Sequence, residues 1–405
     1  MTNEWVVATY QVPDDGDLRK KAESIAVGLT VGTWTDLPAA RRAELEPYKG
    51  VVVDIRRGQV AADGSPVAHL AIGYPVCNLR ADIPSLLTTV FGKLSMDGRI
   101  RLVDLKLPDA FVRAFPGPRL GIAGVRRRLG VWGRPLLMSI FKSCIGLSLA
   151  ELHAQFVAQV EGGVDLVKDD EIFFVDDRAP VFDRIALFRE ALDAHEAKTG
   201  RRVLYAVNLT GPVDELVDRA REAVRQGATA LLLNVLPYGY DILQRLREDS
   251  EITVPVLAHP ALAGALYASP HHGIAAPIVL GTLMRLAGAD LVLFPSPYGT
   301  VPLDEAEAFA LRDRLVAPFA GLAPAFPVPS AGIHPGMVPR LLADFGLDHV
   351  VNAGGGIHGH PDGPRGGGEA FVAAIEAAVA GVPLEERAKT CPALDKALAK
   401  WGVLA

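Results

Sequence analysis

The pattern of apolar and polar positions changes along the chain near residue 134. Beyond it, short apolar segments alternate with segments whose apolar residues recur every three or four positions, which indicates parallel strands joined by amphipathic helices. Strands are predicted at 136–141, 164–167, 203–208, 230–234, 256–259, 291–294, 326–330 and 349–352. Helices are predicted at 149–160, 181–198, 213–226, 304–315, 338–345 and 370–380. Eight strands in about 250 residues predict a (β/α)8 TIM barrel, with an open doubly wound sheet as the alternative.

The first part of the chain has a different, mixed pattern. Alternating segments predict strands at 5–11, 51–55, 67–72 and 100–105, and helices are predicted at 17–26 and 83–90. This mixture predicts a small N-terminal α+β (ferredoxin-like) domain, residues 1–118. Residues 119–133 are rich in Gly, Pro and Arg without a clear period and are predicted to be a linker. The barrel with a C-terminal helical extension then takes residues 134–405.

Composition and charge exclude several classes of partner. Half of the residues are apolar, and the net charge of −6 argues against a nucleic-acid partner. The basic run 126–128 is predicted to be a surface turn. The start of the chain lacks the layout of a signal peptide, and no apolar run reaches the ~18 residues of a membrane span. We therefore expect a cytoplasmic protein with no membrane partner. Three widely spaced cysteines form no disulfide framework or metal motif: Cys77, Cys144 and Cys391.

Polar, titratable or glycine residues follow at least six of the predicted barrel strands. Active sites of such barrels lie at the carboxyl ends of the strands. The densest cluster is in GGVDLVKDDE (162–171), where an apolar run meets four charged residues: Lys168, Asp169, Asp170 and Glu171. Buried charges are tolerated when they are paired or bind a metal, and carboxylate oxygens suit Mg2+. A solvated acidic turn is the alternative to a functional site.

Two glycine-rich loops follow the last two strands, at 330–337 (SAGIHPGM) and 352–363 (NAGGGIHGHPDG). Barrels commonly bind phosphate at this position, and glycine lets backbone N–H groups approach an anion. The two loops together favour a phosphate site over simple tight turns.

Three lysines and one histidine are further candidates. Lys142 and Lys168 end neighbouring strands, and a lysine must lose its proton before it acts as a base or nucleophile. His259 ends the fifth strand and is as compatible with a structural role as with a ligand. Lys93 lies in LLTTVFGKLSMDG of the small domain, where the residues alone do not separate a solvated lysine from a catalyst.

The stretch GGVDLVKDDE resembles the signature of the RuBisCO superfamily, in which CO2 carbamylates the lysine. The resemblance extends over nearly the whole chain and fits a small domain followed by a barrel. It implies that Lys168 is the carbamylated residue and that Lys168, Asp170 and Glu171 hold one Mg2+.

Several positions depart from the carboxylases of this superfamily. The loop 294–304 contains no lysine, and the superfamily's Lys-x-Lys and His-Arg are Lys142-Ser143-Cys144 and His259-Pro260 here. An expected acidic residue is Gly28, and an expected asparagine is Thr89. The chain is therefore not expected to fix CO2.

Seven segments are similar to the RuBisCO-like enolases of methionine salvage: GLTVGTWTDLP, TTVFGKLSMDG, RPLLMSIFK, LYAVNLTG, LFPSPYGTV, VPSAGIHPGMVP and NAGGGIHGHPDG. The similarity implies an isomerase acting on a phosphorylated diketone, with Lys93 as general base. It also implies a homodimer with the active site at the subunit interface. The residues implied to bind substrate or metal are Lys142, Lys168, Asp169, Asp170, Glu171, His259, Gly332, Gly354 and Gly355.

The sequence is also compatible with two other functions. One is another RuBisCO-like sugar-phosphate isomerase, of the methylthioribulose phosphate type. The other is a catalytically silent protein that binds a sugar phosphate. The presence of Lys93 and of the complete Lys-x-Asp-Glu set favours an active enzyme over a silent one.

Overall fold

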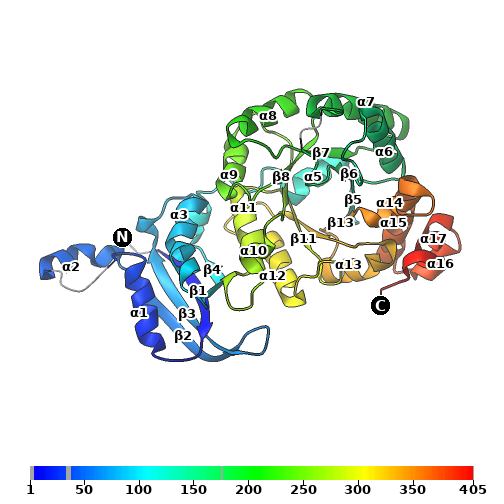
Figure 1. Cartoon of the computed structure of the whole chain (residues 1–405). Helices are drawn as coiled ribbons and strands as arrows, with labels where there is room; N and C mark the ends of the chain where they lie inside the picture. The colour runs from blue at the N-terminus through cyan, green and yellow to red at the C-terminus, as the bar shows by residue number, and fades with distance from the viewer. Residues whose placement is uncertain (1–3, 33–37, 175–176, 405) are drawn as a thin grey trace.

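The structure is a computed structural model that describes residues 4–32, 38–174 and 177–404. A smaller domain built on a mostly antiparallel sheet lies beside a barrel surrounded by helices (Figure 1). The two predicted domain folds are therefore confirmed. The loop 28–36, which includes part of the GLTVGTWTDLP segment, lies partly outside the described residues.

The N-terminal domain has a sheet of order β10-β4-β1-β3-β2. Its first four strands occur where alternation predicts them, although β2 and β3 are longer than predicted. They are β1 (Trp5–Pro13), β2 (Val51–Val60), β3 (Pro66–Pro75) and β4 (Arg101–Lys106). Helical segments are α1 (Leu18–Gly28), α2 (Ala39–Leu45), α3 (Ile83–Leu87), the π-helix η3 (Thr88–Gly92), η4 (Leu94–Met96) and α4 (Asp109–Val112).

The fifth strand of this sheet comes from the barrel half of the chain. β10 (Gly273–Ile274) follows the fifth barrel strand and pairs in parallel with β4. Next to it, Arg101 of β4 donates a hydrogen bond to Glu307 at 2.5 Å. Backbone pairing and a partly buried ion pair thus connect the two domains, a link that no local pattern in the sequence predicts.

The barrel sheet has eight parallel strands in the order β12-β11-β9-β8-β7-β6-β5-β13. All eight predicted strands are confirmed, with ends that differ by at most two residues. They are β5 (Leu136–Ile140), β6 (Leu166–Lys168), β7 (Leu204–Asn208), β8 (Ala230–Asn234), β9 (Val256–His259), β11 (Leu291–Pro295), β12 (Phe326–Ser330) and β13 (Val350–Ala353).

The barrel is nearly closed, and proline explains the remaining seam between β12 and β13. Phe326 donates its N–H toward β11, so the N–H groups at 327 and 329 would point toward β13. Both positions are proline and have no N–H to donate. A side-chain bond from Asn352 Nδ2 to Ser330 Oγ (2.8 Å) joins the two strands instead.

The helices pack around the barrel (Figure 1). Local chemistry sets several of their starts: Ser148 and Glu151 form a capping box at α6, and Asp304 caps α12. The helices are α6 (Leu149–Glu161), α7 (Val181–Thr199), α8 (Val213–Arg225), α9 (Tyr240–Glu248), α10 (Gly264–Tyr267), η5 (Pro277–Thr282), α11 (Leu283–Ala287), α12 (Glu305–Val316), η6 (Pro335–Met337), α13 (Val338–Phe345), α14 (Gly355–His358), α15 (Gly363–Ala380), α16 (Leu384–Ala388) and α17 (Pro392–Trp401).

The segment predicted to be a linker instead contains helix α5 (Gly121–Leu129). Ile122, Val125 and Leu129 of this helix are buried in the same cluster as the residues inside the barrel. Arg126, predicted to lie in a surface turn, is 3% exposed and donates to Asp348 and to backbone carbonyls. The helix closes one end of the barrel, and this tertiary burial compensates for its weak local signal.

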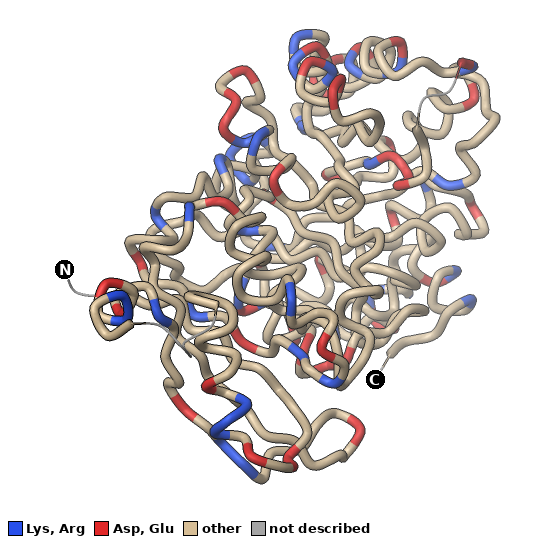
Figure 2. Tube along the Cα trace, turned by 60° about the vertical axis from the view of Figure 1, so that its left-hand side comes forward, with Lys and Arg blue, Asp and Glu red and all other residues tan. Residues whose placement is uncertain are grey.

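Beside a small cluster of Ala370, Ala393 and Ala397, two large apolar clusters form most of the core. One fills the barrel interior, and the other lies between strands and outer helices and continues into the N-terminal domain. Charged positions are distributed over both domains (Figure 2). Among the residues described, no helix combines the length and apolarity needed to cross a membrane.

Candidate active site

Lys168 is the centre of the candidate site at the carboxyl end of β6. Its side chain is fully buried, and Nζ donates to the Asp169 carbonyl at 2.9 Å. The Glu171 carboxylate lies 3.8 Å from the same nitrogen. Burial lowers the pKa of Lys168 to about 8 because the charged form loses hydration, although Glu171 and Asp170 oppose the shift. Lys168 therefore has a substantial neutral, nucleophilic fraction near that pH.

Asp170 pairs with Lys142 from the neighbouring strand end. The two side chains are 2.6 Å apart, from Nζ to Oδ2. Burial raises the pKa of Asp170, but the Lys142 hydrogen bond and charge outweigh burial and hold it below its ordinary value. Gly354 makes room for this lysine, since a Cβ at that position would lie 2.7 Å from Lys142 Cε. The structure thus brings three predicted site residues together.

His259 lies beside Glu171, with 3.5 Å between Nε2 and Oε2. Its Nδ1 accepts the N–H of Ala261 at 3.2 Å, which leaves Nε2 to carry the proton of the neutral ring. Burial, helped by the charge of Lys168, lowers the pKa of His259 well below its ordinary value. The histidine is therefore a neutral hydrogen-bonding group at the rim of the barrel.

Asp169 is adjacent in sequence but its carboxylate has different partners. Arg184 Nη2 lies 3.1 Å from Oδ2, the Tyr205 hydroxyl donates to Oδ1 at 2.7 Å, and the Asn208 N–H donates to Oδ2 at 2.9 Å. Arg184 and Asp169 are both fully buried. The structure therefore does not bring the Asp169 carboxylate into the cluster of Lys168, although sequence resemblance placed it in the binding set.

Two asparagines hold the backbone that follows Lys168. Asn208 Nδ2 donates to the carbonyls of Glu171 and Phe173, each at 3.1 Å, and Asn234 Nδ2 donates to the Glu171 carbonyl at 2.9 Å. The predicted strands 203–208 and 230–234 end at these two asparagines, but sequence reasoning named neither as a site residue. It had no signal for Arg184, which lies on a helix.

The glycine loops lie at the same end of the barrel, after β12 and β13. Gly332 has φ +76° and lies so close to Thr300 that a Cβ would be 2.8 Å from its backbone nitrogen. At Gly355, the first residue of α14, no described atom lies within 4 Å of a Cβ position, so this backbone is accessible to a ligand. These features fit the predicted phosphate loops.

The end of the chain supports these loops from behind. Leu404 donates its N–H to the Gly336 carbonyl at 3.0 Å. Gly336 has no space for a side chain, because a Cβ would lie 1.9 Å from the Gly402 carbonyl oxygen. The rings of His334 and Trp401 stack with 6.1 Å between their centroids. The predicted C-terminal extension is thus packed onto the loop after β12.

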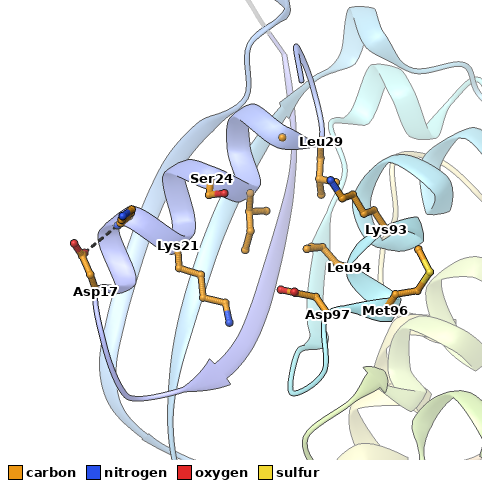
Figure 3. A pocket seen from close by; sticks show the side chains of 11 residues that line it. Asp17, Lys21, Ser24, Leu29, Lys93, Leu94, Met96 and Asp97 are labelled. Carbon is orange, nitrogen blue, oxygen red and sulfur yellow. Dashed lines mark hydrogen bonds between the residues drawn. The ribbon is translucent and has the colours of Figure 1, made fainter. Parts of the chain in front are cut away.

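Lys93 lies apart from these residues, in a pocket of about 700 Å3 in the N-terminal domain. The described residues that line the pocket belong to α1, its flanks and the 93–97 turn. Figure 3 shows the Lys93 side chain extending toward Leu29, with Lys21 and Asp97 farther down the pocket. No described barrel residue lines it, so the structure does not place Lys93 with Lys168 within one chain.

The cluster at Lys168 offers two carboxylates to a metal, those of Asp170 and Glu171. Among the described residues, no group of three or more His, Cys, Asp or Glu side chains is arranged to hold a metal ion. A carbamate on Lys168 would add a third anionic oxygen ligand next to Glu171. The donor set then consists of oxygens, which is the preference of Mg2+.

A (β/α)8 barrel with this lysine and acid cluster, preceded by an α+β domain, defines the RuBisCO class of proteins. The sequence profile of the ribulose bisphosphate carboxylase large chain, catalytic domain, matches residues 121–401. The chain belongs to this family, among its RuBisCO-like enolases.

Similar proteins are found among both carboxylases and enolases. The 2,3-diketo-5-methylthiopentyl-1-phosphate enolase of Geobacillus thermodenitrificans is 53% identical over 406 residues, which cover 98% of each chain. The enzyme of the same name from Bacillus velezensis is 51% identical, again over 98% of each chain. A rubisco-like protein from Alicyclobacillus acidocaldarius has 57% identity and a TM-score of 0.93, covering 98% of this chain and 100% of the other. The octameric RuBisCO of Pyrococcus horikoshii has 30% identity and a TM-score of 0.90, covering 98% and 94%.

The buried pair of Asp169 and Arg184 makes a testable prediction about stability. Asp169→Ala leaves the Arg184 charge buried without its carboxylate, so we expect unfolding free energy to fall by about 3–5 kcal/mol. Urea unfolding followed by circular dichroism measures the loss. Asp218→Ala, on an exposed face of α8, serves as control and should change stability by less than about 0.5 kcal/mol. Equal effects of the two substitutions would contradict the structural role of Asp169.

Proposed function

We propose that this protein is an enolase that converts 2,3-diketo-5-methylthiopentyl-1-phosphate to 2-hydroxy-3-keto-5-methylthiopentenyl-1-phosphate in methionine salvage. The observation that carries the proposal is the site geometry, in which buried Lys168 lies beside Glu171 and Asp170 pairs with Lys142. This geometry occurs in a chain that is 53% identical to a named enolase. The loop 294–304 contains no lysine, which agrees with an enolase and not with a carboxylase.

Lys168, carrying a carbamate, would hold one Mg2+ together with Asp170 and Glu171. The lowered pKa of Lys168 supports carbamate formation, because only the neutral amine attacks CO2. Mg2+ bound there would supply Lewis-acid polarisation of the substrate carbonyls. Lys142 and His259 at the same rim are hydrogen-bond donors for the substrate oxygens.

The phosphate would lie against the backbone of Gly332, Gly354 and Gly355, which fixes the orientation of the carbon chain. Lys93 is then the base that removes a proton from carbon 1. The C–H electron pair forms the double bond between carbons 1 and 2, the carbon 2 oxygen takes the negative charge, and a proton on that oxygen completes the enol. No bond to the phosphate or the thioether changes.

Lys93 would reach the substrate from a second copy of the chain, in a homodimer. Its pocket contains no described barrel residue, and the neighbouring Met96 side chain is 80% exposed. Exposed apolar residues also occur on loops that follow the barrel strands. These are Ile145, Ile172, Phe174, Leu262 and Val301. Exposed apolar side chains on both parts support an interface between the small domain of one chain and the barrel of its partner.

The central test is proton exchange at carbon 1 of the diketone phosphate with Mg2+ and bicarbonate present. The wild type should exchange this proton with deuterium from solvent and form the enol, which NMR and ultraviolet absorbance detect. Lys93→Ala should lower kcat at least about 1,000-fold, because the proton acceptor is lost. Mg2+ binding should remain, since Lys93 is not a ligand. Wild-type exchange no faster than the background rate would refute the enolase, and would favour a silent binding protein.

A second prediction concerns Lys168. Labelled bicarbonate and Mg2+ should give a carbamate carbon signal in wild-type protein and none in Lys168→Ala. Without metal, the amount of carbamate should rise from pH 7 to 9 at constant CO2, because a pKa of about 8 makes the amine increasingly neutral over this range. A lysine amine that stays unmodified under these conditions would exclude the proposed metal site.

A third prediction tests the shared site. Lys93→Ala and Lys168→Ala homodimers should both be inactive, but mixing and re-association should restore activity. A mixed dimer holds one site with both lysines intact, so about a quarter of wild-type activity is expected from random pairing. As a control, the separate variants are taken through the same procedure. No recovery, despite mixed dimers seen by native mass spectrometry, would place both lysines in one chain's site.

A further inference from the structure

We propose that Tyr10 is a positioning residue for Lys93, acting through the π-helix that precedes it. The inference rests on the proposed role of Lys93 as the base. Tyr10 lies in the middle of β1, opposite Leu70 of β3, and is fully buried. Its hydroxyl donates to the Val90 carbonyl at 2.5 Å, across 80 residues of sequence.

The acceptor lies within an unusual turn. η3 is a π-helix of five residues, Thr88–Gly92, and Lys93 follows it directly. Such wide turns are rare and often occur at functional sites, where they change the direction of the side chains that follow. A bond to the Val90 carbonyl therefore fixes the turn that determines where Lys93 points.

A second tyrosine is hydrogen-bonded to Tyr10, and the bond to Val90 determines which of the two hydroxyls donates. Tyr74 of β3 is also fully buried, and its hydroxyl lies 2.7 Å from that of Tyr10. A hydroxyl has one proton to donate. Since Tyr10 donates its proton to Val90, Tyr74 must donate to Tyr10. The chain of bonds runs from Tyr74 to Tyr10 to the Val90 carbonyl, so the π-helix receives this hydrogen bond from Tyr10.

The surroundings of Lys93 show why one bond matters. Phe91 and Leu94 are 5% and 6% exposed and anchor the turn in the core, while Lys93 between them is exposed and lines the pocket. Apolar packing is non-directional and allows small rotations of the turn. The directional hydrogen bond from Tyr10 opposes such a rotation. Without it, even a small rotation of the turn would move Nζ a long way, because the lysine side chain is long.

Two matched variants separate positioning from general stability. Tyr10→Phe leaves the Val90 carbonyl without its side-chain donor, whereas Tyr74→Phe retains that bond. Each removes one hydroxyl from the same buried pair, so both should unfold at lower temperatures than the wild type. We expect Tyr10→Phe to lower kcat for carbon 1 exchange about tenfold, with KM and Mg2+ dependence unchanged. Tyr74→Phe should stay within about twofold of wild type.

Hydrogen–deuterium exchange gives a readout that does not require turnover. Peptides covering 88–97 should exchange faster in Tyr10→Phe than in Tyr74→Phe, while barrel peptides match. Equal kcat values in both variants, or equal exchange of the 88–97 peptides, would overturn the inference. Failure of the proposed function is distinct, because then the wild type itself would show no carbon 1 exchange, and the 88–97 peptides would still decide whether Tyr10 holds the turn.

Discussion

The burial of the Lys168 amine at the end of β6 is the constraint on which the site depends. An ammonium group without solvent is costly unless it is paired, neutralised or modified. Here the nearest groups are a backbone carbonyl and the more distant Glu171 carboxylate. Glu171 favours the charged form, but burial outweighs this effect and lowers the pKa of the amine to about 8. Burial in the barrel wall therefore increases the fraction of Lys168 in the neutral amine form. Carbamylation would require this form.

The acidic side chains next to Lys168 point in different directions and have different partners. Asp169 is held by Arg184 and Tyr205, which fixes the backbone of the cluster from the outer side of the barrel. Asp170 and Glu171 face the other groups of the rim, Lys142 and His259. Asp169 points away from Lys168 and Asp170, as alternate side chains of an extended backbone do. The turn that begins at Glu171 then brings its carboxylate back to the side of Lys168.

Sequence reasoning succeeded where local pattern determines the structure. Each barrel strand is a short apolar run flanked by a turn or helix signal, so all eight could be located. It failed where burial comes from distant residues. α5 has many glycines and arginines, and becomes a helix because the open end of the barrel accepts its apolar face. β10 has two residues and exists only because β4 presents a free edge. The partners of Asp169 are likewise brought together by the fold.

Under the proposed mechanism, the position of Lys93 makes the site of one chain incomplete. The groups suited to hold a metal and a phosphate lie at the barrel rim, while Lys93 lies in a pocket whose described lining belongs to the other domain. Within the chain, the β10–β4 pairing and the ion pair of Arg101 with Glu307 connect the two domains. A large rotation that brought Lys93 over its own barrel would break these backbone hydrogen bonds and this partly buried ion pair. In the proposed homodimer, a second copy would supply Lys93 without that cost. The same rigidity makes the local turn at Lys93 important, because errors in its direction cannot be corrected by domain movement.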